Sequence, residues 1–133
     1  MPAPRSAAPR AAEIVAVFAG GTAGTALRAV VGLLVPPLDA VPVATVAINV
    51  AGAFALGALL AALAGRGPGA GRRLRLLLGT GVLGGFTTFS ALAVDTAGLL
   101  GARRLPEAVA YGLGSVLAGI LAAALGERVG RRT

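Results

Sequence analysis

The stretch GTGVLGGFTTFS, residues Gly79 to Ser90, interrupts the third of four long apolar runs in this chain. It combines four glycines with a pair of threonines and two phenylalanines. Free backbone polar groups are costly in hydrocarbon, so such a break is tolerated at membrane depth only where protein or a polar cavity surrounds it. Discontinuous helices of this kind usually carry an ion or substrate site. The stretch therefore predicts a third membrane-spanning helix that is broken near the membrane midplane.

The composition around this stretch is that of an integral membrane protein. Of 133 residues, 56% are hydrophobic and 13% are charged, where a soluble domain carries about 25% charged residues. The chain has no cysteine and no histidine, which excludes disulfides, thiolate metal sites and imidazole bases. It also shows no nucleophile–base pair and no phosphate loop, so we expect no enzymatic activity.

The four apolar runs are each long enough to cross a hydrocarbon core of about 30 Å at 1.5 Å per residue. They cover about residues 12–35, 41–64, 74–100 and 105–126. Short connections predict an all-α, four-helix transmembrane domain at 11–128, between a disordered arm at 1–10 and a basic tail at 129–133. So thin a unit encloses little cavity by itself, and we therefore expect an oligomer.

Pairs of small residues spaced four apart recur in every run and predict close helix contacts in lipid. A chain this rich in alanine and glycine also produces such pairs by chance, and this alternative stays open. The pairs are Gly20 and Gly24, Ala53 and Gly57, Gly81 and Gly85, and Ser115 and Gly119.

The arginines are distributed unevenly between the two sides of the predicted bundle. Nine fall on the side that carries both termini and the middle loop, against Arg103 and Arg104 on the other side. By the positive-inside rule both termini face the cytoplasm, across the plasma membrane or bacterial inner membrane. The nine are Arg5, Arg10, Arg66, Arg72, Arg73, Arg75, Arg128, Arg131 and Arg132.

Polar residues inside the apolar runs need a reason, because burying them in lipid costs free energy. Arg28 either snorkels to the far interface or places a positive charge near a pore mouth. Asn49 either bonds a neighbouring helix or offers its amide donors to an anion. Tyr111 and Ser115 share one helix face as a possible hydroxyl track; the alternatives are an interfacial tyrosine and a serine bonded to its own i−4 carbonyl. Asp95 is either a proton carrier or a residue at a wet boundary.

This inventory suits an anion better than a cation, because donors outnumber acidic side chains and cation pores usually show acidic rings or carbonyl filters. The edge of an aromatic ring also carries a positive partial charge, so Phe89 is a candidate to hold a small anion. Ordinary packing is the alternative for Phe89.

The chain resembles the CrcB/Fluc family of fluoride channels in all four runs and in family order. The matching segments are GGTAGTALR (Gly20 to Arg28), INVAGAFALG (Ile48 to Gly57), GTGVLGGFTTFS (Gly79 to Ser90) and YGLGSVLAG (Tyr111 to Gly119). The resemblance implies a dimer of antiparallel four-helix subunits that exports fluoride passively. It also implies a structural Na⁺ at the dimer centre, held by the backbone carbonyls of Gly84 and Thr87. The positions that match the family's anion pathway are Asn49, Phe89, Ser90, Tyr111 and Ser115, and Arg28 matches the arginine that ends the first motif.

The sequence departs from the family pattern directly after Ser90. Where the family usually continues T-F-S-x-E, this chain has Ala91, Leu92, Ala93 and then Asp95. Leu92 replaces the second aromatic of a phenylalanine pair, and Phe86 precedes Phe89 instead of following it. Together with the arginine bias, this suggests one subunit of a heterodimer, although a homodimer stays open.

Two other functions compete with a conducting subunit. A non-conducting scaffold subunit would explain the lost phenylalanine and hydroxyls. A small four-helix proton-coupled multidrug exporter would share the size, but it needs a membrane-embedded glutamate in the first run. That run has only Glu13, at its edge, and the chain has no tryptophan.

Overall fold

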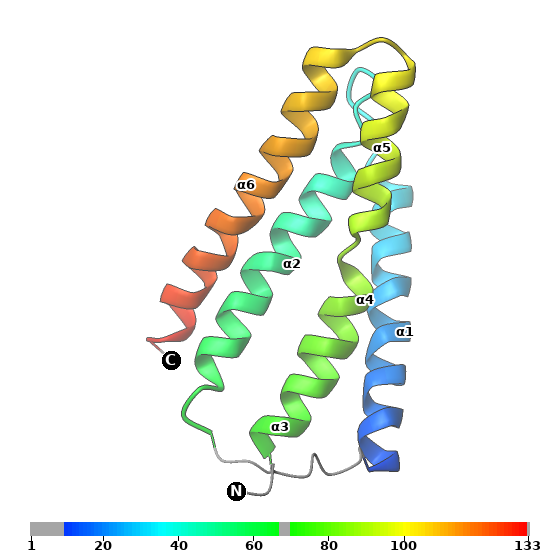
Figure 1. Ribbon diagram of the computed structural model, residues 1–133. Coiled ribbons are helices and arrows are strands. Elements are labelled where there is room, and N and C mark those ends of the chain that lie inside the picture. Colours follow the sequence, from blue (N-terminus) through cyan, green and yellow to red (C-terminus); the bar gives the residue numbers. More distant parts are fainter. Residues whose placement is uncertain (1–9, 67–69, 133) are drawn as a thin grey trace, which may run out of the picture.

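Four long apolar helices run along the molecule in the computed structural model, which describes residues 10–66 and 70–132 (Figure 1). Each is long and apolar enough to cross a membrane, which confirms the prediction of a four-span, all-helical chain. The arm expected at 1–10 lies outside the described residues except for Arg10. The helices are α1 (Ala11–Leu34), α2 (Val43–Ala62), a third span made of α3 (Ala70–Leu74), the π-helical η1 (Arg75–Leu83), α4 (Gly84–Phe86) and α5 (Phe89–Gly101), and α6 (Leu105–Gly130).

The ends of the helices follow local chemistry. α1 ends just before Pro36 and Pro37, because proline lacks an N–H and disfavours helix in the residue before it. α6 has Pro106 in its first turn, where the missing N–H costs nothing. It continues to Gly130, beyond the end expected at residue 126, and the i,i+4 ion pair of Glu127 with Arg131 supports these last turns.

The third span is interrupted over a shorter stretch than the sequence suggested. Its glycines from Gly79 to Gly85 remain helical, in the wide turns of η1 and then in α4. The chain leaves the helix only at Thr87 (ψ 157°) and Thr88 (φ −152°, ψ 117°), both extended. The break is therefore a two-threonine step between α4 and α5, and the glycines serve a different purpose.

That purpose is close packing against α1. A Cβ atom added to Gly24 would collide with the Val82 carbonyl, and one added to Gly20 would collide with the Leu77 carbonyl. α2 packs on α6 in the same way, since Gly57 faces the backbone of Ala123. The predicted small-residue contacts are thus present in the first three spans, whereas Gly119 in α6 faces open space.

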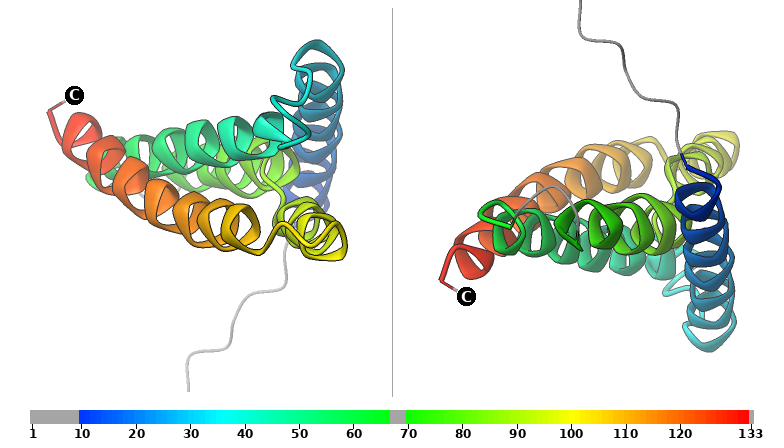
Figure 2. Two further views of the ribbon diagram at one scale, coloured as in Figure 1. Left: turned by 90° about the horizontal axis from the view of Figure 1, so that it is seen from above. Right: turned by 90° about the horizontal axis from the view of Figure 1, so that it is seen from below.

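The helices form two adjacent pairs. α2 lies along α6, and α1 lies along η1 and α4, with α5 reaching back to α6 (Figure 2). The beginning of α1 and the end of α6 lie at the same end of the molecule (Figure 1). Eight arginines of the described residues belong to this end: Arg10, Arg66, Arg72, Arg73, Arg75, Arg128, Arg131 and Arg132.

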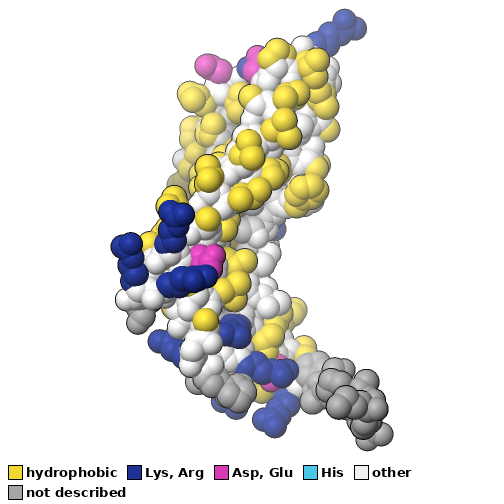
Figure 3. All heavy atoms as spheres, turned by 60° about the vertical axis from the view of Figure 1, so that its left-hand side comes forward, with side chains coloured by type: hydrophobic (Ala, Val, Ile, Leu, Met, Phe, Trp, Pro, Cys, Tyr) yellow, Lys and Arg dark blue, Asp and Glu magenta, His cyan; other side chains and the backbone are white. Residues whose placement is uncertain are grey.

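The surface is largely apolar, as expected for a chain surrounded by lipid. Large side chains such as Phe18, Leu33 and Leu121 are well exposed, and apolar side chains cover much of the face shown in Figure 3. A small buried cluster joins α5 to α6 through Leu92, Leu99, Ala108 and Tyr111. Much of the apolar surface therefore remains for lipid or for another subunit.

Candidate ion site at the broken helix

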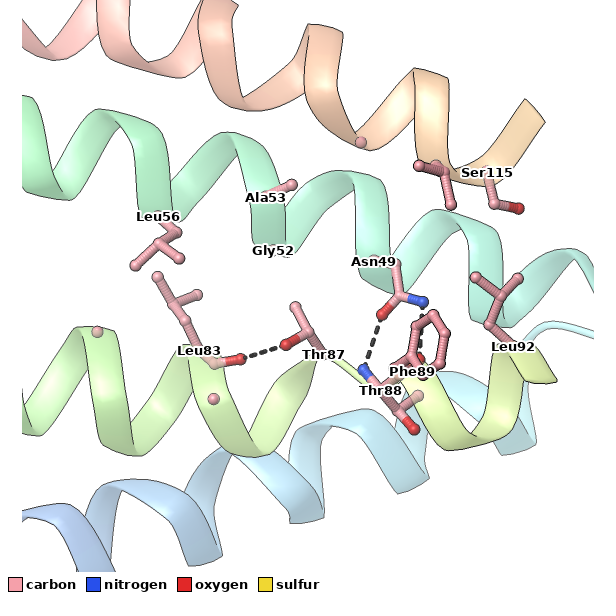
Figure 4. A pocket seen from close by; sticks show the side chains of 14 residues that line it. Asn49, Gly52, Ala53, Leu56, Leu83, Thr87, Thr88, Phe89, Leu92 and Ser115 are labelled. Carbon is pink, nitrogen blue, oxygen red and sulfur yellow. Dashed lines mark hydrogen bonds between the residues drawn. The ribbon is translucent and has the colours of Figure 1, made fainter. Parts of the chain in front are cut away.

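A hollow of about 360 Å³ lies beside the break in the third span, between α2, the third span and α6 (Figure 4). Its walls are mostly apolar, with a few polar groups near the two-threonine step. The lining residues are Asn49, Gly52, Ala53, Leu56, Gly79, Leu83, Gly84, Thr87, Thr88, Phe89, Leu92, Ser115, Val116 and Gly119.

Asn49 holds the break through both ends of its side-chain amide (Figure 4). Its Nδ2 donates to the Thr88 carbonyl oxygen at 2.9 Å, and its Oδ1 accepts from the Thr88 backbone N–H at 2.8 Å. The amide replaces bonds that a continuous helix would have supplied to the buried Thr88. Since Nδ2 carries two hydrogens, one donor of Asn49 is left for the hollow that it lines.

Thr88 caps the second half of the broken span. Its Oγ1 accepts from the backbone N–H of Ala91 at 3.1 Å and lies 3.2 Å from the Ser90 Oγ. This is the side-chain geometry of an N-cap, in which a hydroxyl satisfies one of the free donors at the start of a helix. α5 can therefore begin at Phe89 without a helical turn before it.

The same two contacts release two backbone carbonyls. In a continuous helix the Gly84 carbonyl would accept from the Thr88 N–H, which here is bound to Asn49. The Thr87 carbonyl would accept from the Ala91 N–H, which here is bound to the Thr88 hydroxyl. Gly84 and Thr87 are the two positions at which the family resemblance implies carbonyl ligands, and both residues line the hollow. Oxygen ligands of this kind suit a hard cation.

The cap can be tested by replacing Thr88. We expect Thr88→Ala to lower the free energy of unfolding by about 1 kcal/mol, as is typical for the loss of an N-cap oxygen. Thr88→Ser keeps the oxygen and is the matched control, which should retain stability. Thermal unfolding in detergent measures both variants; equal loss in the two would show that the Thr88 methyl group, and not its hydroxyl, stabilises the step.

Of the six residues predicted for an anion pathway, three line the hollow: Asn49, Phe89 and Ser115. Phe89 is 77% exposed, so its ring is not part of the core. Ser90 is adjacent, bonded to Thr88. Arg28 lies on α1, and Tyr111 lies on α6 one turn before Ser115; neither belongs to this lining.

The hydroxyls of α6 have partners within the chain. The Ser115 hydroxyl donates to the Tyr111 carbonyl, one turn earlier in α6. The phenol of Tyr111 is buried and lies 3.0 Å from the Pro42 carbonyl oxygen and 2.9 Å from Asp95 Oδ2. Asp95 therefore binds Tyr111 across α5 and α6, and the pair ties the start of α2 to this end of the bundle.

Leu92 occupies the wall of the hollow where the family motif has its second phenylalanine. It is 7% exposed and belongs to the buried cluster between α5 and α6. A leucine presents no positively polarised ring edge. The lining of this chain thus offers a single aromatic ring, that of Phe89.

Four apolar helices surround a break that the half-buried amide of Asn49 holds in place. This arrangement defines a class of small membrane proteins with several spans, one of which is an interrupted helix. The chain belongs to the CrcB family, whose model, described as "CrcB-like protein, Camphor Resistance (CrcB)", matches residues 15–127. It is 50% identical over 128 residues to "Fluoride-specific ion channel FluC 2" of Leifsonia xyli subsp. xyli, covering 89% of this chain and 88% of that protein. It is 46% identical to "Fluoride-specific ion channel FluC 1" of Cutibacterium acnes (80% and 77% covered) and 44% identical to "Fluoride-specific ion channel FluC" of Paracoccus denitrificans (86% and 91% covered).

Proposed function

We propose that this chain is a subunit of a fluoride-selective channel that lets cytoplasmic fluoride leave the cell passively. The observation that carries the proposal is the Asn49 amide at the break, which lines a mostly apolar hollow and keeps one donor available. Relatives named as fluoride-specific ion channels, at 38–50% identity over most of the chain, support it.

Conduction would replace the hydration shell of fluoride by a few weak contacts. The free Asn49 N–H and the edge of the exposed Phe89 ring supply positive partial charge on one wall of the hollow. Ser115 would contribute as a donor only after its hydroxyl turns away from the Tyr111 carbonyl. Several weak contacts in series allow the ion to leave as well as to enter. In the cell, such a channel would release fluoride that entered as HF and ionised inside.

Fluoride efflux from liposomes tests this function. We expect vesicles that contain the assembled channel, this chain together with its partner subunit, and are loaded with fluoride to release it when a potassium ionophore balances the charge, as followed with a fluoride electrode. Chloride-loaded vesicles are the matched control and should show no release. Equal release of both anions would contradict a fluoride-selective pathway.

We further propose that the channel is a dimer of antiparallel subunits, with both termini of this chain in the cytoplasm. The hollow is open on one side and Phe89 is 77% exposed, so a second subunit would complete the pathway. Eight arginines of the described residues at one end favour a fixed orientation, which suits a heterodimer better than a dual-topology homodimer. Efflux from vesicles that contain this chain alone would exclude an obligatory heterodimer.

A structural Na⁺ at the dimer centre fits the donor set at the break. The carbonyls of Gly84 and Thr87 have lost their helical donors to Asn49 and Thr88, which leaves oxygens suited to a hard cation. Two subunits would contribute two such pairs. The ion would supply positive charge that balances these carbonyl dipoles; replacing external and internal sodium by a large organic cation should lower dimer stability.

A non-conducting scaffold subunit is the second candidate, favoured by Leu92 in the wall of the hollow. A Phe89→Ala variant, reconstituted together with the partner subunit, separates the two functions. Reduced fluoride flux would identify this chain as part of the pathway, whereas unchanged flux at equal assembly would identify it as a scaffold.

A further inference from the structure

A second hollow, of about 630 Å³, lies in the seam between α2 and α6 at the arginine-rich end of the molecule. It is hollow because the facing side chains are short: four alanines and a glycine lie where larger residues would close the seam. Its walls are apolar apart from one end. The lining residues are Gly57, Leu60, Ala61, Ala64, Ala123, Ala124, Glu127 and Arg131.

Positive charge gathers at the polar end of this seam. Arg131 lines the hollow and is held by two hydrogen bonds to Glu127, which fix the position of its guanidinium. Arg128 is exposed on the same stripe of α6, since Ala124, Arg128 and Arg131 follow one another at i, i+4 and i+7. The α2 end adds Arg66, also exposed. Arginine side chains gather at this end of the molecule in Figure 3.

A groove on α1 shows that this charge is not a general property of the surface. It has a similar volume, about 600 Å³, and among the described residues it is lined by apolar, glycine and threonine residues alone: Val17, Phe18, Gly21, Thr22, Thr25, Ala26 and Ala29. The α2–α6 seam combines an apolar trench with a fixed cation at its mouth. Only an amphiphile with an anionic head matches both parts.

We propose that the α2–α6 seam binds one acidic phospholipid, with an acyl chain along Gly57, Ala61 and Ala124 and its phosphate at Arg131 and Arg128. Guanidinium groups bind phosphate oxygens in paired geometry. The cytoplasmic leaflet supplies acidic lipids, and the arginine-rich end is the one that the positive-inside rule places there. The bound lipid would cover the hollow seam and hold the α2–α6 pair together.

The test is a lipid titration of the purified, assembled protein by native mass spectrometry, with dioleoyl phosphatidylglycerol and dioleoyl phosphatidylcholine as probes. We expect tighter binding of the phosphatidylglycerol. Arg131→Gln should weaken it about fivefold, since one basic residue near an acidic lipid surface contributes about 1 kcal/mol. Arg103→Gln, which removes one arginine from the opposite end, is the matched control and should leave binding unchanged.

The apolar part of the seam has its own variant. Ala61→Leu fills the trench without altering any charge and should abolish the preference for phosphatidylglycerol, whereas Ala110→Leu, at an exposed α6 position outside both grooves, should preserve it. Thermal unfolding in phosphatidylcholine verifies that each variant is folded. Equal loss in Arg131→Gln and Arg103→Gln would overturn the proposal, and so would unchanged binding in Ala61→Leu. Competition by soluble glycerol phosphate at concentrations comparable to the lipid would also overturn it, because a head group alone would then suffice.

Discussion

Asn49→Ala should abolish fluoride flux and loosen the broken helix at the same time. The substitution removes both bonds that the side chain makes to Thr88, and it leaves a backbone N–H and a carbonyl in a part-buried position without partners. Each unsatisfied group costs about 1–3 kcal/mol, so even the smaller value for two groups predicts a loss of more than tenfold in the population of the open break. Fluoride efflux from liposomes and thermal unfolding in detergent measure the two consequences.

Two further variants distinguish the roles of the Asn49 amide. Asn49→Asp keeps an oxygen for the Thr88 N–H but loses both amide donors, so it should be folded and non-conducting. Thr22→Val removes a hydroxyl that bonds only the Phe18 carbonyl within α1, and as a control it should change neither quantity. Full efflux from Asn49→Asp would show that fluoride does not use the amide donor.

Much of the fold could be predicted because lipid imposes a simple requirement: each span must be long, apolar and internally hydrogen-bonded. Four runs of that length and the loops between them follow directly. The break could also be predicted, from threonines and glycines within an apolar run. The exact position of the break could not be predicted, because glycine is compatible with a helix as well as with an interruption. The glycines of the third span stay helical because α1 and the third span pack backbone against backbone, at Gly24 and Gly81 among other positions.

The candidate site could be predicted in residue type but not in hydrogen bonding. Asn49 was equally compatible with holding a neighbouring helix and with facing an ion; the structure shows that it holds Thr88 and still lines the hollow. The Ser115 hydroxyl donates to the carbonyl four residues earlier, which is the alternative that the sequence analysis gave to a hydroxyl track. Thr88 was missed as a functional residue, although a threonine three positions before Ala91 and just before an apolar run is a recognisable N-cap signal.

Arg28 and the pair of Tyr111 and Asp95 show what a linear sequence cannot supply. All three lie inside apolar runs, and helix periodicity alone does not say which of them face the break. Tyr111 shares a face with Ser115, yet its phenol points to Asp95 and Pro42 because α5 and the α1–α2 loop pack on that side. Arg28, Tyr111 and Asp95 lie outside the lining of the hollow because of how the spans cross, and this crossing depends on contacts among all four helices.

Gly24→Leu should prevent assembly of the α1 pair, because any Cβ at this position collides with the Val82 carbonyl and approaches the Phe86 backbone N. Backbone atoms cannot rotate away as a side chain can, so α1 would have to separate from η1 and α4. Overpacking a dense contact typically costs about 1–3 kcal/mol, and here the obstacle is main chain, so we expect the upper end or more. The readout is the fraction of monodisperse protein after extraction, followed by thermal unfolding.

Gly32→Leu is the matched control, since it makes the same substitution in the same helix at a position with open space around it. It should extract and unfold like the unaltered protein. If Gly32→Leu were as damaging as Gly24→Leu, the cost would belong to the loss of glycine in α1 and not to its contact with η1. A selective effect at Gly24 would instead mean that the absence of a side chain at this position of α1 lets α1 pack against the backbone of Val82 and Phe86 in the third span.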